Sequence, residues 1–237
     1  MRKDAQYHLI FFLFFLTCSG TLPAYGQSAA AYNIINPSET SPNLPLLNGR
    51  IWHNKYSRAQ GDPYFLSDGF LKGSVSFNGR KYDDLDLRYD IFNDELILRT
   101  ENKPIIIMNK EMVDDFDLIF ENRIHHIINT GNDTSSILKG YVNLLYDGPS
   151  ALFVKYSKII YPLGAEGRYD LFSQEHRVFM RTETGLVPVK RKRGLLNLFG
   201  SERKEIRDHL RRSRIRITWK EPSTLVPVLE YYDTIRK

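Results

Sequence analysis

The feature that most constrains the fold is a two-residue alternation of apolar and polar side chains, interrupted at short intervals by turn residues. In residues 73–100, GSVSFNGRKYDDLDLRYDIFNDELILRT, Val75 and Phe77 share one face. Asn78 and Gly79 follow as a two-residue hairpin turn, because both positions tolerate a positive φ. A period of two places one face of each strand in the core and the other in water, so the stretch predicts antiparallel strands.

The same pattern continues as far as residue 189 with almost no helical period. It recurs in DDFDLIF, in GYVNLLYDGPSALFVKYSKII, which turns at Asp147-Gly148, and in YDLFSQEHRVFMRTETGLVPV. The chain also holds 14 Tyr and 14 Phe, residues that favour strands. We therefore expect a mainly β (α+β) protein whose residues 49–189 form an antiparallel meander, as a sandwich or a partly closed barrel, followed by short C-terminal helices.

The first 26 residues predict a signal peptide. Arg2 and Lys3 precede an apolar run from Leu9 to Leu16, and Ala24-Tyr25-Gly26 offers small residues where a signal peptidase reads. This run is too short to span a bilayer core, and no later run has membrane length, so no transmembrane segment is expected in the mature chain. The expected location is the periplasm or the cell surface.

Cys18 raises a rival interpretation, a lipoprotein acylated at this cysteine. Leu16 and Thr17 match poorly the residues that usually precede a lipidated cysteine, so cleavage after Gly26 is the preferred prediction. Because Cys18 is the only cysteine, the mature chain would then lack disulfides, thiol nucleophiles and cysteine metal sites. Residues 27–48 are rich in Ala, Ser, Asn and Pro without a period, which predicts a flexible lead-in.

Charge is distributed unevenly along the chain. Residues 190–220 hold twelve Lys/Arg and three acids, which gives them a formal charge of +9. The signal region carries +1. Because the whole chain has a net charge of +5, the remaining residues carry −5. Ser201 as N-cap, and Ile206 and Leu210 at a spacing of four, predict a helix here. We expect residues 190–237 to be a basic helical region packed on the β domain, with RIRITW as an edge strand and a last helix around Leu225 to Ile235.

Three sequence elements, which follow one another along the chain, resemble those of a known group of proteins. They are the hairpin with Leu-Leu-Tyr-Asp-Gly, a short LLNLF helix before a charged helix, and a closing helix with Tyr231-Tyr232. Over residues 64–237 the chain resembles a group of uncharacterised exported β-rich proteins common in Bacteroidota. The resemblance implies an envelope location and carries over no catalytic residue.

The basic region is the predicted contact surface for an anionic component of the envelope: lipid, lipopolysaccharide or an acidic protein. Several exposed Lys/Arg near an anionic membrane suffice for peripheral attachment. The alternative is a solvated helical face docked against the acidic β domain. Nucleic acid is not expected as a partner of an exported chain. The predicted contact residues are Lys190, Arg191, Lys192, Arg193, Arg203, Arg207, Arg211 and Arg212.

Two acidic clusters offer the other candidate chemistry. Asp84 with Asp86, and Asp115 with Asp117, each share one face of a strand, and together they could hold Ca²⁺ or supply an acid and a base for glycoside hydrolysis. The simpler interpretation is that the wet face of each strand carries Asp. Adjacent His125 and His126 would point to opposite faces of a strand. Neither His-Glu-x-x-His nor Gly-x-Ser-x-Gly occurs.

These observations favour a non-enzymatic exported protein that acts as a binding or structural module of the cell envelope, without a cofactor. The alternative is a secreted, carbohydrate-directed hydrolase that uses the Asp clusters.

Overall fold

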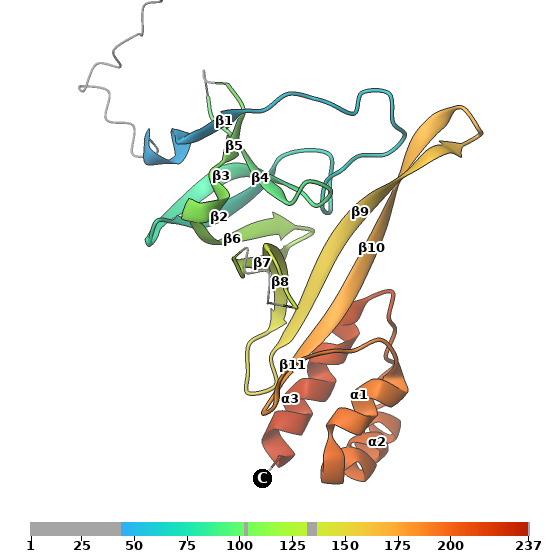
Figure 1. Cartoon of the computed structure of the whole chain (residues 1–237). Helices are drawn as coiled ribbons and strands as arrows, with labels where there is room; N and C mark the ends of the chain where they lie inside the picture. The colour runs from blue at the N-terminus through green and yellow to red at the C-terminus, as the bar shows by residue number, and fades with distance from the viewer. Residues whose placement is uncertain (1–43, 102–103, 132–136, 237) are drawn as a thin grey trace, which may run out of the picture. The chain divides into compact units, whose positions relative to one another are not determined.

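The computed structural model describes residues 44–101, 104–131 and 137–236, and in them eleven strands form one antiparallel sheet (Figure 1). The strand order is β1-β5-β4-β3-β2-β6-β7-β8-β9-β10-β11. This confirms the predicted β-rich antiparallel meander with short C-terminal helices; the strands form a single sheet that does not close into a barrel. The predicted signal peptide, with Cys18, and residues 27–43 of the predicted lead-in lie outside the described residues.

The strands differ greatly in length, from three residues at one edge to fourteen in the longest hairpin. They are β1 (Gly49–Ile51), β2 (Leu71–Phe77), β3 (Arg80–Asp90), β4 (Glu95–Arg99), β5 (Ile106–Met108), β6 (Val113–Phe120), β7 (Arg123–Asn129), β8 (Tyr141–Tyr146), β9 (Leu152–Ala165), β10 (Tyr169–Thr182) and β11 (Gly185–Pro188). Short 3-10 turns lie at Leu44–Leu47 and Lys110–Met112. Leu46 in the first of them is fully buried and packs with apolar residues of the β domain.

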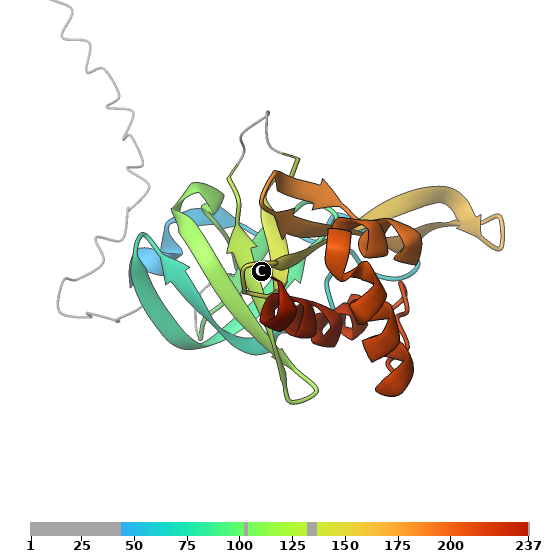
Figure 2. The ribbon, with the colours of Figure 1, turned by 90° about the horizontal axis from the view of Figure 1, so that it is seen from below.

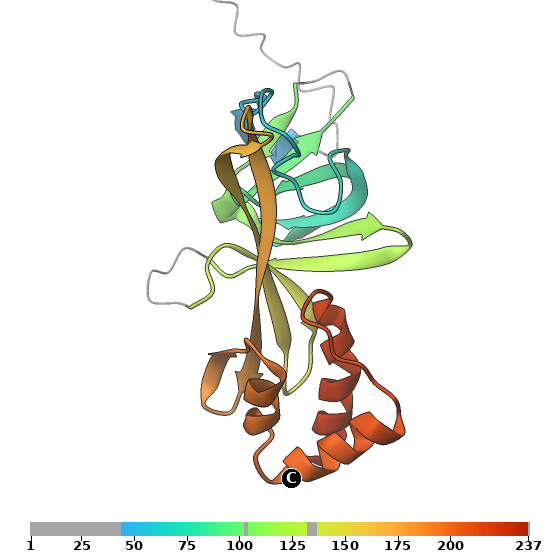
Figure 3. The same cartoon turned by 90° about the vertical axis from the view of Figure 1, so that its right-hand side faces the viewer.

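Local turn chemistry sets the hairpins. Asn78 and Gly79 have φ of 55° and 74°, and Phe77 pairs with Arg80 across them, as the sequence predicts. The hairpin of β8 and β9 turns after Tyr146, also as predicted. The β6–β7 and β9–β10 hairpins project in different directions from the sheet (Figure 3).

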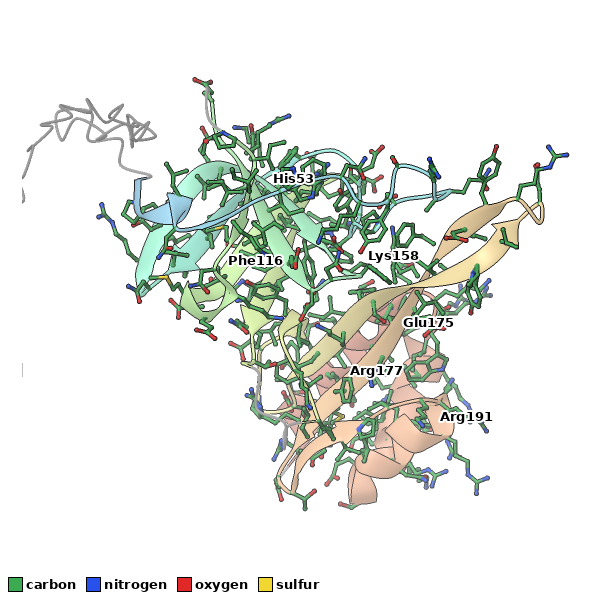
Figure 4. All side chains as sticks on the ribbon, turned by 45° about the horizontal axis from the view of Figure 1, so that its top comes forward. His53, Phe116, Lys158, Glu175, Arg177 and Arg191 are labelled. Atoms are coloured by element: carbon green, nitrogen blue, oxygen red, sulfur yellow. The ribbon has the colours of Figure 1, made fainter. Side chains whose placement is uncertain are left out.

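The segment between β1 and β2, residues 52–70, crosses the sheet, because β1 pairs at the outer edge with β5 while β2 lies in the middle. It also reaches the long hairpin: Gln60 bridges to Leu171, and Asp62 accepts from the Nζ of Lys158 at 2.8 Å (Figure 4). We call residues 52–70 the crossing segment. It ties one end of the meander to the other.

The crossing segment covers a sheet face that the alternation predicts to be wet. Arg88 of β3 is only 9% exposed, and its guanidinium lies over the rings of Trp52, Tyr64 and Phe70 at 4.0–4.8 Å. Its Nη1 donates to the carbonyl of Asp68. Burial lowers the pKa of Arg88, and the stacked rings stabilise the cation without a carboxylate contact. The expectation of a wet face is therefore wrong at Arg88, where distant aromatic side chains form a second layer.

Two large apolar cores lie on opposite halves of the sheet. The first fills the concave side of β2–β6 and contains Val75, Phe77 and Phe116 (Figure 4). The second lies between the helices and the start of β9 and end of β10, where Leu152 and Met180 are buried. Tyr156 of β9 packs against both cores.

Three helices pack beside one another against β8, β9 and β10 (Figure 2). They are α1 (Lys192–Leu198), α2 (Arg203–Arg212) and α3 (Val226–Ile235), with 3-10 turns at Gly200–Glu202 and Pro222–Leu225. As predicted, α2 buries Ile206 and Leu210.

Two local predictions in this region are wrong. Residues 214–219 pair with no strand of the described chain, although Ile215, Ile217 and Trp219 do pack against the second core. Ser201 belongs to a 3-10 turn and makes no capping hydrogen bond; its hydroxyl donates to Glu202 instead. In both places the packing of the apolar residues determines the path of the chain.

Truncating a core residue of α3 tests the contribution of the second core. Leu229 is fully buried, so Leu229→Ala should lower the free energy of unfolding by about 2–5 kcal/mol in chemical denaturation. The exposed neighbour is the control: Glu230→Ala should change it by less than about 0.5 kcal/mol. Equal effects at both positions would contradict the packing described.

Candidate functional site

The most distinctive surface is the basic helical surface, which we define as the Lys and Arg side chains of residues 190–220. All are exposed except Arg203, which is half-buried. They come from three segments: the chain leading into α1, helix α2, and the extended stretch after it. The members are Lys190, Arg191, Lys192, Arg193, Arg203, Lys204, Arg207, Arg211, Arg212, Arg214, Arg216 and Lys220.

Helix α2 gives this surface its order. Arg203, Arg207 and Arg211 follow one another at a spacing of four and therefore lie along one row of the helix. Ile206 and Leu210 form the buried stripe, which lies next to this row, and Arg203 at its border is half-buried. Like charges at this spacing repel and destabilise a helix by a few tenths of a kcal/mol per pair, so the row gives α2 no stability of its own.

The cations of the basic helical surface have almost no counter-charge within the described chain. Among the described residues, Arg211 alone approaches a carboxylate, that of Asp208 at 4.0 Å. Of the other two acids of the region, Glu205 accepts from the hydroxyl of Tyr231, and Glu202 accepts from that of Ser201. Figure 4 places Arg191 at the outer side of the helical region.

Several carboxylates of the sheet, in contrast, are paired with cations of the sheet. Asp86 contacts Lys72 and Arg99, and Glu95 contacts Arg50. Among the described residues, the ion pairs between the sheet and the helical region are Arg236 with Glu183, and Arg123 with Glu221 at 3.9 Å. The basic helical surface is thus not docked on the sheet's acids; apolar contacts hold the helices.

The Asp clusters lie on the exposed face of β3, β2 and β6, but the structure does not bring them together. Strand β2 separates Asp84 and Asp86 on β3 from Asp115 and Asp117 on β6. Lys72 Nζ on β2 lies 3.0 Å from Asp84 and 3.3 Å from Asp86. No group of three or more His, Cys, Asp or Glu in the described part of the chain has metal-binding geometry.

The pKa of Asp86 does not suit a general acid. Partial burial raises it, but hydrogen bonds from Arg99 and Lys72 outweigh burial, so the pKa lies below its ordinary value. A general acid of a glycosidase needs a raised pKa to hold its proton near neutral pH.

The partners on β6 are also structural. Asp115 accepts from the hydroxyl of Ser76 at 3.0 Å, and Asp117 accepts from that of Ser74 at 3.0 Å. His126 Nδ1 lies 2.7 Å from Asp117, whereas the ring of His125 packs against Phe65. The two histidines thus point to opposite faces, as predicted.

A largely buried ionic cluster, which the sequence pattern does not indicate, centres on Asp94, in the turn after β3. Its Oδ1 accepts from Tyr89 Oη at 2.6 Å and Lys155 Nζ at 2.8 Å, and its Oδ2 pairs with Lys110. Burial raises the pKa of Asp94, but Lys155 and Lys110 outweigh this, so the net pKa is below the ordinary value. The cluster joins β3, β5–β6 and β9 across the first core.

Replacing Asp94 should make stability depend differently on pH. A carboxyl with a depressed folded-state pKa contributes stability above its unfolded pKa of about 3.9, and this is lost as pH falls through the folded value. Asp94→Asn leaves Lys155 and Lys110 unpaired, so it should lower the free energy of unfolding by about 3 kcal/mol at pH 7, with the difference shrinking below about pH 4. The measurement is urea denaturation across pH.

The exposed Asp147 provides the control, because among the described residues it has no hydrogen-bond or ionic partner. Asp147→Asn should leave the unfolding free energy unchanged at every pH. A pH-independent loss in Asp94→Asn would contradict the assigned ionic role.

A second buried carboxylate, Asp233, joins α3 to the turn between β8 and β9. Its Oδ2 accepts from Tyr146 Oη at 2.9 Å and from the backbone N of Ser150 at 3.0 Å. Arg236, one turn later, donates to Ser150 Oγ and Glu183. Burial, together with the bond to Asp233, raises the pKa of Tyr146 to about 12. The Tyr-Asp-Gly hairpin and the paired-tyrosine helix, both singled out in the sequence, therefore contact each other directly.

A cavity of about 430 Å³ lies beside this junction, lined by Ser150, Glu183 and Arg236 among others. Two of the charged groups that line it, Arg236 and Glu183, form an ion pair with each other. The contacts of Asp233 and Arg236 therefore hold α3 against the turn between β8 and β9.

Removing the Tyr146 hydroxyl tests how much its hydrogen bond to Asp233 contributes to stability. Tyr146→Phe leaves a buried carboxylate one donor short and should lower the free energy of unfolding by about 1.5–3 kcal/mol in urea denaturation. Tyr161 is the matched control, because this residue is 48% exposed and no hydrogen bond of its hydroxyl occurs among the described residues. Tyr161→Phe should change stability by less than about 0.5 kcal/mol.

Comparison of the chain with protein-family models, with curated proteins and with solved structures finds no match in any of the three. The resemblance to exported Bacteroidota proteins thus stays a prediction. No helix among the described residues is both long and apolar enough to cross a bilayer.

Proposed function

We propose that this protein is an exported, non-catalytic binding module of the cell envelope, and that its basic helical surface is the contact site for an anionic partner. Export rests on the N-terminal sequence pattern. The surface rests on the charge and exposure of residues 190–220.

The observation that carries the proposal is the concentration of exposed cations without carboxylate partners in one helical region. Asp86, Glu95 and Asp94 each meet a cation of the sheet, whereas eleven of the twelve cations of the basic helical surface have no carboxylate within 4.0 Å among the described residues. Concentrated unpaired charge raises the free energy of the isolated protein through self-repulsion, and an anionic partner relieves it. Such a surface also accelerates encounter with that partner.

The hydrolase alternative has no comparable support. Lys72 and Arg99 hold Asp86 in its charged form, and β2 separates the two Asp pairs. A carboxylate pair flanking a substrate needs one member that keeps its proton, which the two cations beside Asp86 oppose.

A soluble polyanion tests the proposed function without reference to its natural source. Fluorescently labelled polyphosphate should bind the mature protein in an anisotropy titration, and binding should weaken steeply with salt, because pairing releases condensed counterions. Lys204→Gln/Arg207→Gln/Arg211→Gln removes three exposed cations of α2. At about 1 kcal/mol each, it should weaken binding about 100-fold and flatten the salt dependence.

The control removes three exposed cations of the β domain, none of which has a carboxylate within 4.0 Å among the described residues. Lys55→Gln/Arg58→Gln/Lys139→Gln makes the same change in net charge, so it separates the site from the overall charge. Equal weakening in both triple variants, or no binding of polyphosphate at low salt, would overturn the proposal.

A further inference from the structure

We infer that the anionic partner is the surface of a lipid bilayer rich in anionic headgroups, and that the protein attaches to it by charge alone, without inserting apolar side chains. This inference rests on the proposed function and names the partner of the same surface. Two properties of that surface decide it: its lack of exposed apolar anchors and the spread of its cations.

The first property separates a membrane from a protein partner. Every exposed large apolar side chain among the described residues lies at or before Tyr169, so the helical region exposes none. Specific protein interfaces take most of their binding energy from a few buried aromatic or apolar anchors surrounded by a polar rim. The basic helical surface has the charged residues typical of an interface rim but lacks the apolar anchors typical of an interface centre. An acidic protein is therefore a less suitable partner than a membrane.

The second property concerns the distribution of charge. The cations come from three segments and are not gathered into an enclosed site; Lys204, Arg211 and Arg212 border only an open groove along α2. A deep pocket would favour one compact anion. Dispersed charges instead match many anionic headgroups at once, and their small individual attractions add up at the membrane surface.

The apolar residues near the cations are already engaged in the protein. In residues 214–220 cationic and apolar side chains alternate, and Ile215, Ile217 and Trp219 are half-buried against the second core. His176 also contacts the carbonyl of Trp219 at 2.6 Å, which anchors the end of this stretch to β10. The segment therefore presents its cations outward while the core retains its apolar side chains, unlike an amphipathic helix that buries an apolar face in the bilayer.

Co-sedimentation of the mature full chain with vesicles tests the inference. We expect binding to phosphatidylcholine vesicles that contain phosphatidylglycerol, and none to pure phosphatidylcholine. Binding should be strong at about 0.01 M salt, where the screening length is about 30 Å, and lost at about 1 M, where it is about 3 Å. Lys204→Gln/Arg207→Gln/Arg211→Gln should weaken binding about 100-fold, and the matched β-domain variant Lys55→Gln/Arg58→Gln/Lys139→Gln should bind like the unchanged protein.

Tryptophan fluorescence separates surface attachment from insertion. With lipids brominated on their acyl chains, the emission of Trp52 and Trp219 should remain unquenched while the protein is bound. Quenching, or binding that survives high salt, would overturn the claim of attachment by charge alone.

Three other outcomes overturn the choice of lipid while leaving the proposed function in place. They are binding to polyphosphate but not to phosphatidylglycerol vesicles, tight binding to lipopolysaccharide alone, and salt-sensitive self-association that the α2 triple variant abolishes. The last would place the exposed acids of a second copy on the basic helical surface, and sedimentation velocity of the protein alone detects it. Failure to bind any of these anions at low salt would instead remove the proposed function itself.

Discussion

The β9–β10 hairpin joins the two apolar cores of this protein, and the rest of the structure depends on that sharing. Near the helices, Leu152 and Met180 pack against α1–α3, and further along β9 Tyr156 also contacts the core of the meander. Because apolar burial holds the helices on the sheet, their polar faces need no partner within the fold. The cations of α2 are thus exposed as a consequence of how the helices are anchored, and charge pairing plays little part in that anchoring.

Two buried carboxylates complement this apolar packing by fixing particular segments. Asp94 gathers side chains from three parts of the sheet, and Asp233 holds α3 to the turn after β8. Each buried carboxylate accepts several donors, which offsets much of the free energy of removing it from water. Such groups restrict which segments can meet, whereas apolar surfaces alone tolerate many arrangements.

The sequence predicted what depends on near neighbours. The alternation of apolar and polar residues predicted the strands, and Asn78-Gly79 predicted a hairpin. The spacing of Ile206 and Leu210 predicted the buried side of α2. The covering of Arg88 by the crossing segment could not be predicted, because Trp52 and Tyr64 come from a part of the chain with no regular period. The basic helical surface was predicted from charge density alone. Ion pairs of the sheet, such as Asp86 with Lys72 and Arg99, depend on contacts between strands that the sequence does not reveal.

The open sheet leaves two outer strands whose outward backbone groups lack a neighbouring strand, and both are very short. Strand β1 has three residues, and β11 has four, ending at Pro188, which has no amide hydrogen to donate. Short edge strands of this kind offer another chain little backbone to pair with. Beyond their pairing with β8 and β11, by contrast, the long strands β9 and β10 have only each other as strand neighbours among the described residues, so any additional strand has far more backbone to pair with there.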